Sequence, residues 1–385
     1  MSAQLLPLIR SKVVLGQPLP WNVRDRQGGL LLRQGHVVDT EKQLELLLER
    51  GATVNADEAR AAARAEQTAV TDARRPHLLS VFDLWNGLAL RLKAVWHSLP
   101  LEQEFTAGVD TLAHELIALS QREPDIGIFL MVRQERSNHI DYAYNHSVHT
   151  AMVCVLLARR LEWPQHEMES LVRAALTMNL SIGELQGRMA SQDFPMLERQ
   201  EAQIRRHPHE VAGLLATAGV TDEAWLRTVR DHHEHVDGSG YPLGKSEVDR
   251  LAQALRLADV FCAKLTPRLI RAPLSPQEAE RRLYAEGKVD AGVMVLAMAL
   301  IHELGIYPPG DLVQLKSGEL AVVVKRGAHA KTPLVATLTD TQGRPIVATH
   351  RRDTSDPLYA VTGAVTQKAL VARLPPERVF GYALA

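Results

Sequence analysis

The chain has 385 residues, of which 46% are hydrophobic, and its 44 Lys and Arg against 45 Asp and Glu give a formal net charge of -1. At roughly 150 residues per domain this length predicts two to three domains, and the hydrophobic fraction excludes a wholly disordered chain. The balanced charge argues against a nucleic-acid partner, because a general nucleic-acid binder carries a basic excess.

Membrane and export signals are missing from the sequence pattern. The longest apolar stretch, at about residues 291–301, is shorter than the roughly 20 residues that span a bilayer. The N-terminus lacks a charged region followed by a long apolar run, so we expect no secretory signal and a cytoplasmic location. Cys154 and Cys262 lie in apolar helical segments, which predicts buried free thiols rather than a disulfide framework.

The hydrophobic pattern divides the chain into four parts. Residues 1–60 combine short β-type runs with a Leu-rich helix, which predicts a small α+β module. Residues 61–135 are interpreted as a helical linker and helical region, and residues 136–305 as a helical bundle with apolar residues at three- and four-residue steps. Residues 306–385 hold short β-type runs separated by Gly and Asp turns, which predicts a small antiparallel β domain. The predicted fold class is mainly α.

Histidines gather in one part of the chain, since nine of the 16 lie between His139 and His235. The segments that carry them are Asn145-His146-Ser147, Arg206-His207-Pro208 and Asp231-His232-His233-Glu234-His235, followed by the run Asp237-Gly238-Ser239-Gly240-Tyr241-Pro242 and the helical acid Asp259. Each segment also fits an ordinary structural role, because the glycine-rich run is a good turn sequence and His207-Pro208 fits a helix boundary. Spacing alone leaves metal binding and structural packing equally open.

The order of these motifs resembles the HD-GYP domain, a subgroup of the HD phosphohydrolase superfamily, over about residues 136–305. The run from His232 to Pro242 is the most specific part, and the start of the β region at 306–310 is similar to extensions of such proteins. The resemblance implies an HD-type helical bundle in a bacterial signalling protein. Family members hold two or three metal ions, often iron or manganese, and hydrolyse cyclic di-GMP.

One short stretch departs from the family pattern. Met178 stands where the family's histidine is expected, Asn179 where its metal-bridging aspartate is expected, and Ile182 where its phosphate-binding lysine is expected. A thioether is a poor ligand for hard or borderline divalent ions, a neutral amide cannot replace a bridging carboxylate, and isoleucine cannot pair with phosphate. The resemblance therefore predicts a degenerate two-metal site with no intact catalytic set.

Five residues match the family's other metal ligands. His146 and Asp259 resemble ligands of one metal, whereas His207, His232 and His233 resemble the non-bridging ligands of the other. Three imidazoles can hold a single ion that keeps an open position. A single divalent metal (Zn, Mn or Fe) at these three histidines is therefore the one cofactor that the sequence leaves open.

A further group of residues is interpreted as a ligand-binding or docking region. Its members are Asp237, Gly238, Gly240, Tyr241, Pro242, Arg268 and Arg271. The resemblance implies that the loop lies near the mouth of the site and contacts diguanylate cyclase (GGDEF) domains. The two arginines stand where family members carry an Arg-Pro-Tyr-Arg-like segment and suit bidentate recognition of phosphate or guanine, although solvated arginines at a helix end are an equal alternative.

Three functions follow from these observations. The first is a degenerate HD-GYP protein that acts as a signalling or interaction module in cyclic di-GMP regulation, with weak or absent phosphodiesterase activity. The second is an active metal-dependent phosphodiesterase with a mononuclear histidine site. The third is a scaffold without a nucleotide ligand. Cyclic di-GMP, GGDEF-domain or other signalling proteins, and a second copy of the chain are the partners that the sequence leaves open.

Overall fold

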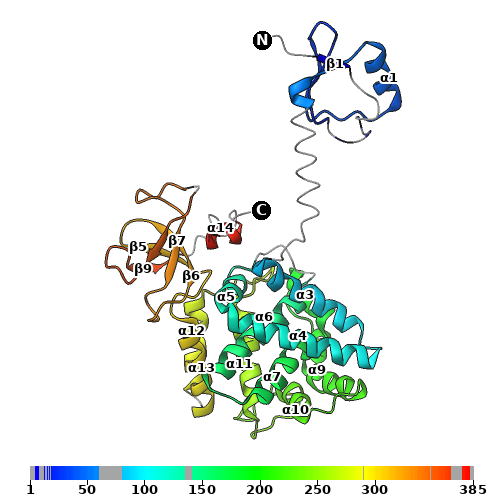
Figure 1. Ribbon diagram of the computed structural model, residues 1–385. Helices are drawn as coiled ribbons and strands as arrows, with labels where there is room; N and C mark the ends of the chain where they lie inside the picture. Colours follow the sequence, from blue (N-terminus) through cyan, green and yellow to red (C-terminus); the bar gives the residue numbers. More distant parts are fainter. Residues whose placement is uncertain are drawn as a thin grey trace. The chain divides into compact units, whose positions relative to one another are not determined.

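The computed structural model describes residues 5–7, 13, 15, 17, 19–59, 80–134, 141–288, 290–346, 348–365 and 375–381. The contacts divide the chain into two units, Met1–Leu78 and Leu79–Ala385 (Figure 1). The part of the linker at 60–79 lies outside the described residues, and the domain boundaries given above stay predictions. None of the described helices is both long and apolar enough to cross a membrane.

The N-terminal unit is a four-stranded sheet with one labelled helix. Its elements are β1 (Leu5–Pro7), β2 (Val23–Arg24), β3 (Leu30–Leu32), α1 (Glu41–Glu49) and β4 (Thr53–Asn55). The strand order is β1-β4-β2-β3, and the pairs are antiparallel. Helix α1 begins after Thr40 because this residue and Gln43 form a reciprocal capping box. Leu44 of α1 packs with Trp21 and Val54 in a small core of this unit.

The second unit is built around a helical bundle. Its helices are α3 (Val81–His97), α4 (Glu102–Arg122), α5 (Pro124–Val132), α6 (Tyr142–Arg160), α7 (Gln165–Thr177), α8 (Gly183–Ser191), α9 (Glu198–Thr217), α10 (Glu223–Asp231), α11 (Arg250–Leu265), α12 (Pro276–Gly287) and α13 (Ala291–Leu304). Helix α6 is the centre, because it packs against α3, α4, α7, α8, α11 and α13 and is buried from Ala151 to Ala158 without a break. A helix that is apolar all round belongs inside a bundle.

A five-stranded antiparallel sheet completes the second unit (Figure 1). Its elements are β5 (Leu312–Leu315), β6 (Leu320–Lys325), β7 (Leu334–Thr337), β8 (Arg351–Asp353) and β9 (Val361–Ala364), followed by α14 (Pro376–Phe380). The strand order is β8-β7-β6-β5-β9. Phe129 of α5 packs into the apolar face of this sheet, and Arg326 bonds Asp125 at 2.6 Å and Glu303 at 3.0 Å. The predicted mainly α fold class with small β parts is confirmed.

Candidate functional site

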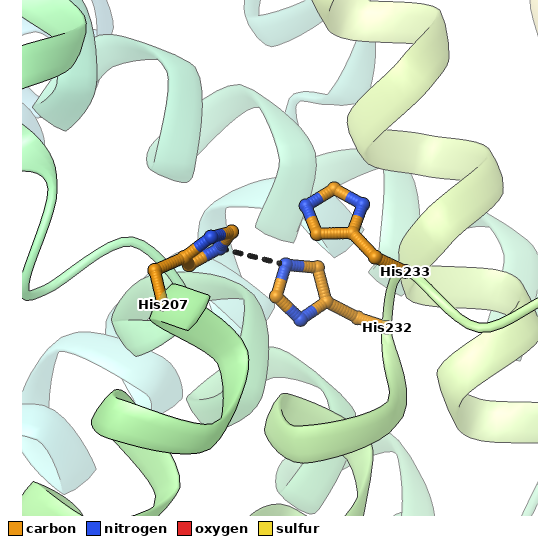
Figure 2. A group of neighbouring side chains, drawn as sticks. All are labelled: His207, His232 and His233. Carbon is orange, nitrogen blue, oxygen red and sulfur yellow. Dashed lines mark hydrogen bonds between the residues drawn. The ribbon is translucent and has the colours of Figure 1, made fainter. Parts of the chain in front are cut away.

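Three histidines that were predicted as metal ligands come together where α9 meets the end of α10 (Figure 2). One ring nitrogen from each of His207, His232 and His233 lies within 4.8 Å of the others. The Nε2 atoms of His207 and His232 are 3.3 Å apart. Two ligands of a tetrahedral ion with metal–nitrogen distances of about 2.0–2.1 Å would lie ~3.3–3.4 Å apart. The spacing therefore fits a single shared cation.

The backbone holds two of these rings in the orientation that a metal requires. Pro208 lies inside α9, not at its start, and it has no N–H to donate to the carbonyl of Ile204. That free carbonyl instead accepts the Nδ1–H of His207 at 2.5 Å. Where α10 ends, the carbonyl of Val229 in the same way accepts the Nδ1–H of His232 at 2.6 Å. The Nε2 of each ring therefore keeps a free lone pair, which faces the other ring.

Burial keeps these imidazoles neutral. His207 and His232 are fully buried, and desolvation, with the nearby ring of His232, lowers the pKa of His207 to about 3. Desolvation also lowers the pKa of His232 and that of His233. A neutral imidazole is the form that binds a metal, so the protein holds these histidines ready for a cation at neutral pH.

The other predicted ligand pair joins α6 to α11. The Nε2 of His146 and the Oδ1 of Asp259 are 2.6 Å apart. Burial would raise the pKa of Asp259, but the hydrogen bond from His146 and the neighbouring histidines hold it well below its usual value. Tyr142 stacks on His146 with ring centres 5.8 Å apart. Asp259 is therefore a carboxylate whose charge is already engaged by a partner within the protein.

A cavity of about 140 Å³ joins the two ligand groups. The predicted site residues that line it are His146, Asn179, Ile182, His207, His233, Tyr241, Asp259 and Arg268. Sequence reasoning missed Gln186, Met189, Ile204 and Ala263, which also line it. Two of these, Gln186 and Met189, lie on α8. Met178 is fully buried in the apolar core of the bundle and does not line the cavity.

The glycine-rich loop packs on the histidine cluster. Tyr241 stacks on His233 with ring centres 4.6 Å apart, and its N–H donates to the carbonyl of His233 at 3.1 Å. Gly240 makes this approach possible, because a Cβ there would lie 2.4 Å from the backbone nitrogen of His235. The loop therefore forms one wall of the cavity through its tyrosine.

Glu234 anchors this loop, a role that sequence reasoning missed. Its fully buried carboxylate accepts the backbone N–H of Leu243 at 2.7 Å and of Lys245 at 2.9 Å. The Nζ of Lys245 also pairs with Asp231 at 2.7 Å. The signal for this role was present as an acid directly after the histidine pair, but its backbone partners lie nine and eleven residues away.

The remaining predicted residues lie outside the cavity lining. Asp237 is exposed, and its carboxylate accepts the N–H and O–H of Ser239 at 2.9 and 2.6 Å, which closes a local turn. Gly238 adopts a φ of +75° within that turn, and Pro242 follows the tyrosine. Arg271 is exposed and donates to the carbonyl of Ala263 at 2.5 Å. Of the two predicted arginines, only Arg268 lines the cavity.

Comparisons with known proteins cover the segment that carries these residues. Residues 130–292 match the family model described as HD domain. The chain is 31% identical over 241 residues to a cyclic di-GMP phosphodiesterase of Pseudomonas aeruginosa, which covers 60% of this chain and 55% of that protein. It is 33% identical over 95 residues to a probable cyclic di-GMP phosphodiesterase of Vibrio cholerae, over 24% of this chain and 21% of that protein.

A solved structure is also similar. It is an HDG"Y"P protein from Bdellovibrio bacteriovorus, with a TM-score of 0.47 and 15% identity, and the match covers 77% of this chain and 98% of that chain. The segment at residues 130–292, which matches an HD domain, contains His207, His232 and His233. The HD-domain match and the 31% identity to a cyclic di-GMP phosphodiesterase support the HD-GYP resemblance that the motifs predicted. The chain spans about half the length of the longer-matching curated relative, 55% of it.

Proposed function

We propose that this chain is a signalling or interaction module of cyclic di-GMP regulation whose phosphodiesterase activity is weak or absent. One observation carries the proposal: Asp259 is the single carboxylate among the described residues that line the cavity, and it is bonded to His146. A two-metal centre needs an anionic group that bridges its ions. Asn179 stands at the expected bridging position and offers only a neutral amide.

The proposed ligand is cyclic di-GMP. The curated relatives are named as phosphodiesterases of this dinucleotide, and the loop that holds Tyr241 against the cavity is kept in this chain. Arg268 provides a positive charge at the cavity, which suits a phosphodiester. GGDEF-domain partners, a homodimer and a cytoplasmic location stay predictions from the sequence.

We also propose that His207, His232 and His233 hold one divalent metal. HD domains are typically metal-dependent, and the neutral rings and the 3.3 Å separation of two Nε2 atoms fit such an ion. Three imidazole ligands at this spacing favour zinc over the harder Mn²⁺. When bound, the metal would supply a Lewis acid that polarises a phosphoryl oxygen. His207 and His232 would direct their Nε2 atoms at it through their bonds to the backbone.

Turnover of cyclic di-GMP tests the proposal. The full chain is assayed under reducing conditions with added Mn²⁺, Fe²⁺ or Zn²⁺, beside a family member that has the intact His-Asp pair. We expect turnover to be more than about 100-fold slower, since the loss of supporting groups alone costs about 10- to 100-fold. Turnover equal to that of the intact relative and abolished by His233→Ala would refute the proposal.

A mononuclear phosphohydrolase is the second candidate, because the histidine cluster fits one ion. It requires near-stoichiometric metal in protein purified without oxygen and chelators, with hydrolysis that disappears together with the metal in His207→Ala. Metal-free purified protein that regains no activity with added metal excludes it. Calorimetric titration with cyclic di-GMP separates both candidates from a scaffold that binds no nucleotide.

A further inference from the structure

Two carboxamide side chains line the cavity without hydrogen-bond partners. They belong to Asn179 and Gln186, and neither side chain bonds to another described residue. The Nδ2 of Asn179 and the Oε1 of Gln186 are buried and unpaired. Buried polar atoms almost always have a partner in folded proteins, so two unsatisfied carboxamides on one small cavity indicate that a ligand completes their bonding.

Both carboxamides can present N–H groups to that ligand. The unpaired buried atom of Gln186 is its oxygen, and because no hydrogen bond of a described residue fixes this amide, a half turn exchanges its oxygen and nitrogen. No hydrogen bond fixes the orientation of the Asn179 amide, so a half turn about its last torsion exchanges oxygen and nitrogen without breaking a bond. The preferred partner of two such donors is an oxygen that carries negative charge.

Arg268 adds a positive charge to the same wall. It lines the cavity, and its Nη2 and Nε donate to the hydroxyl of Tyr142 at 2.9 and 3.3 Å. The guanidinium also lies over the Tyr142 ring, 5.3 Å from its centre. No carboxylate of the described residues forms an ion pair with it. Its Nη1 therefore remains available to an anion, in a side chain that Tyr142 already holds in position.

We propose that Asn179, Gln186 and Arg268 form an oxyanion subsite that takes a phosphoryl group directly. An aspartate at position 179 would favour a cation at this point, whereas the amide reverses the preference and provides a donor. Asp259, the one acid of the cavity, is bonded to His146 at 2.6 Å, and a cation at the three histidines would offset its charge further. This inference rests on the proposed function, because it assumes that the cavity binds cyclic di-GMP.

The cavity volume limits how a ligand enters. About 140 Å³ corresponds to roughly four or five waters at about 30 Å³ each. This space accepts one phosphoryl group and excludes a whole dinucleotide. The subsite therefore holds one phosphate of a cyclic dinucleotide while the bases and the second phosphate lie outside the cavity.

Calorimetric titration of the full chain loaded with one equivalent of zinc, with excess metal removed, tests the subsite, with inorganic phosphate and cyclic di-GMP as separate probes. The variants are Asn179→Asp and Gln186→Glu, which keep the shape of each side chain but exchange a donor for a charged acceptor. Gln165→Glu, at the exposed first residue of α7, is the matched control. We expect each cavity variant to raise the Kd for cyclic di-GMP about tenfold or more, while the control binds as wild type does. Near-UV circular dichroism confirms that the variants are folded.

The outcomes separate the subsite from the function on which it rests. Weakened binding of both probes supports a phosphoryl subsite that also takes free phosphate, and weakened binding of cyclic di-GMP alone supports one specific for the phosphodiester. Wild-type affinity in both cavity variants overturns the inference, as does a wild-type chain that binds neither probe. Fast hydrolysis of cyclic di-GMP by a chain whose variants bind weakly would instead refute the proposed function and leave the subsite standing.

Discussion

Replacing Pro208 by alanine should raise the stability of the protein and lower its affinity for a metal. Alanine restores a backbone N–H at position 208, which can donate to the Ile204 carbonyl in the ordinary helical pattern. That carbonyl is the acceptor that now holds the Nδ1–H of His207. The His207 ring then loses the bond that fixes its tautomer and points its Nε2 at His232.

The two effects have opposite signs. A proline inside a helix is about 3 kcal/mol less favourable than alanine. The buried ring loses about two methylene groups, at about 0.8 kcal/mol each, and alanine makes the unfolded chain more flexible by about 0.5 kcal/mol. We therefore expect the metal-free Pro208→Ala protein to be about 1 kcal/mol more stable. Loss of the bond that orients a metal-ligating histidine should lower metal affinity about 10- to 100-fold.

Two measurements check this prediction. Urea unfolding of the metal-free protein gives the stability, and competition between the protein and a chromophoric chelator gives the zinc affinity. Leu214→Ala, at an exposed position of the same helix, is the control and should change neither quantity by much. Unchanged zinc affinity in a stabilised Pro208→Ala protein would show that the Ile204 carbonyl does not orient His207.

Three further predictions concern protonation and the loop. Burial and the nearby His146 ring lower the pKa of His149 to about 3, so the folded protein keeps this imidazole neutral while the unfolded chain binds a proton below about pH 6.5. The free energy of unfolding therefore falls by about 2 kcal/mol between pH 6.5 and pH 5 because of this residue. In His149→Asn the urea-unfolding midpoint should depend less on pH over that range. Glu234→Gln turns one amide N–H toward a backbone donor and should lower the stability of the loop by about 2 kcal/mol. Faster proteolysis between residues 236 and 245 would be the measured result. Gly240→Ala should lower the stability by about 1–3 kcal/mol because its Cβ would overlap backbone atoms, and an unchanged melting temperature would show that the loop absorbs the clash.

The sequence alone indicated the resemblance to HD-GYP domains, the mainly helical class and the candidate ligands. These depend on which residue types follow one another, as in the run from His232 to Pro242, and on apolar spacing along amphipathic helices. The departure at Met178 and Asn179 is likewise a matter of residue type. Helix α5 lies in the region predicted to be helical, but six of its nine residues are buried, so its own apolar run shows no helical period.

Only the tertiary structure decided how the candidate site is arranged. No local sequence pattern shows that the carbonyls of Ile204 and Val229 orient two histidines. This arrangement depends on a proline inside one helix and on the end of another helix. The meeting of Gln186 with Arg268 at one cavity joins residues 82 positions apart. Hydrogen-bond satisfaction is a property of three-dimensional neighbours rather than of sequence neighbours. The unpaired carboxamides that suggest an oxyanion subsite could therefore be recognised only in the folded protein.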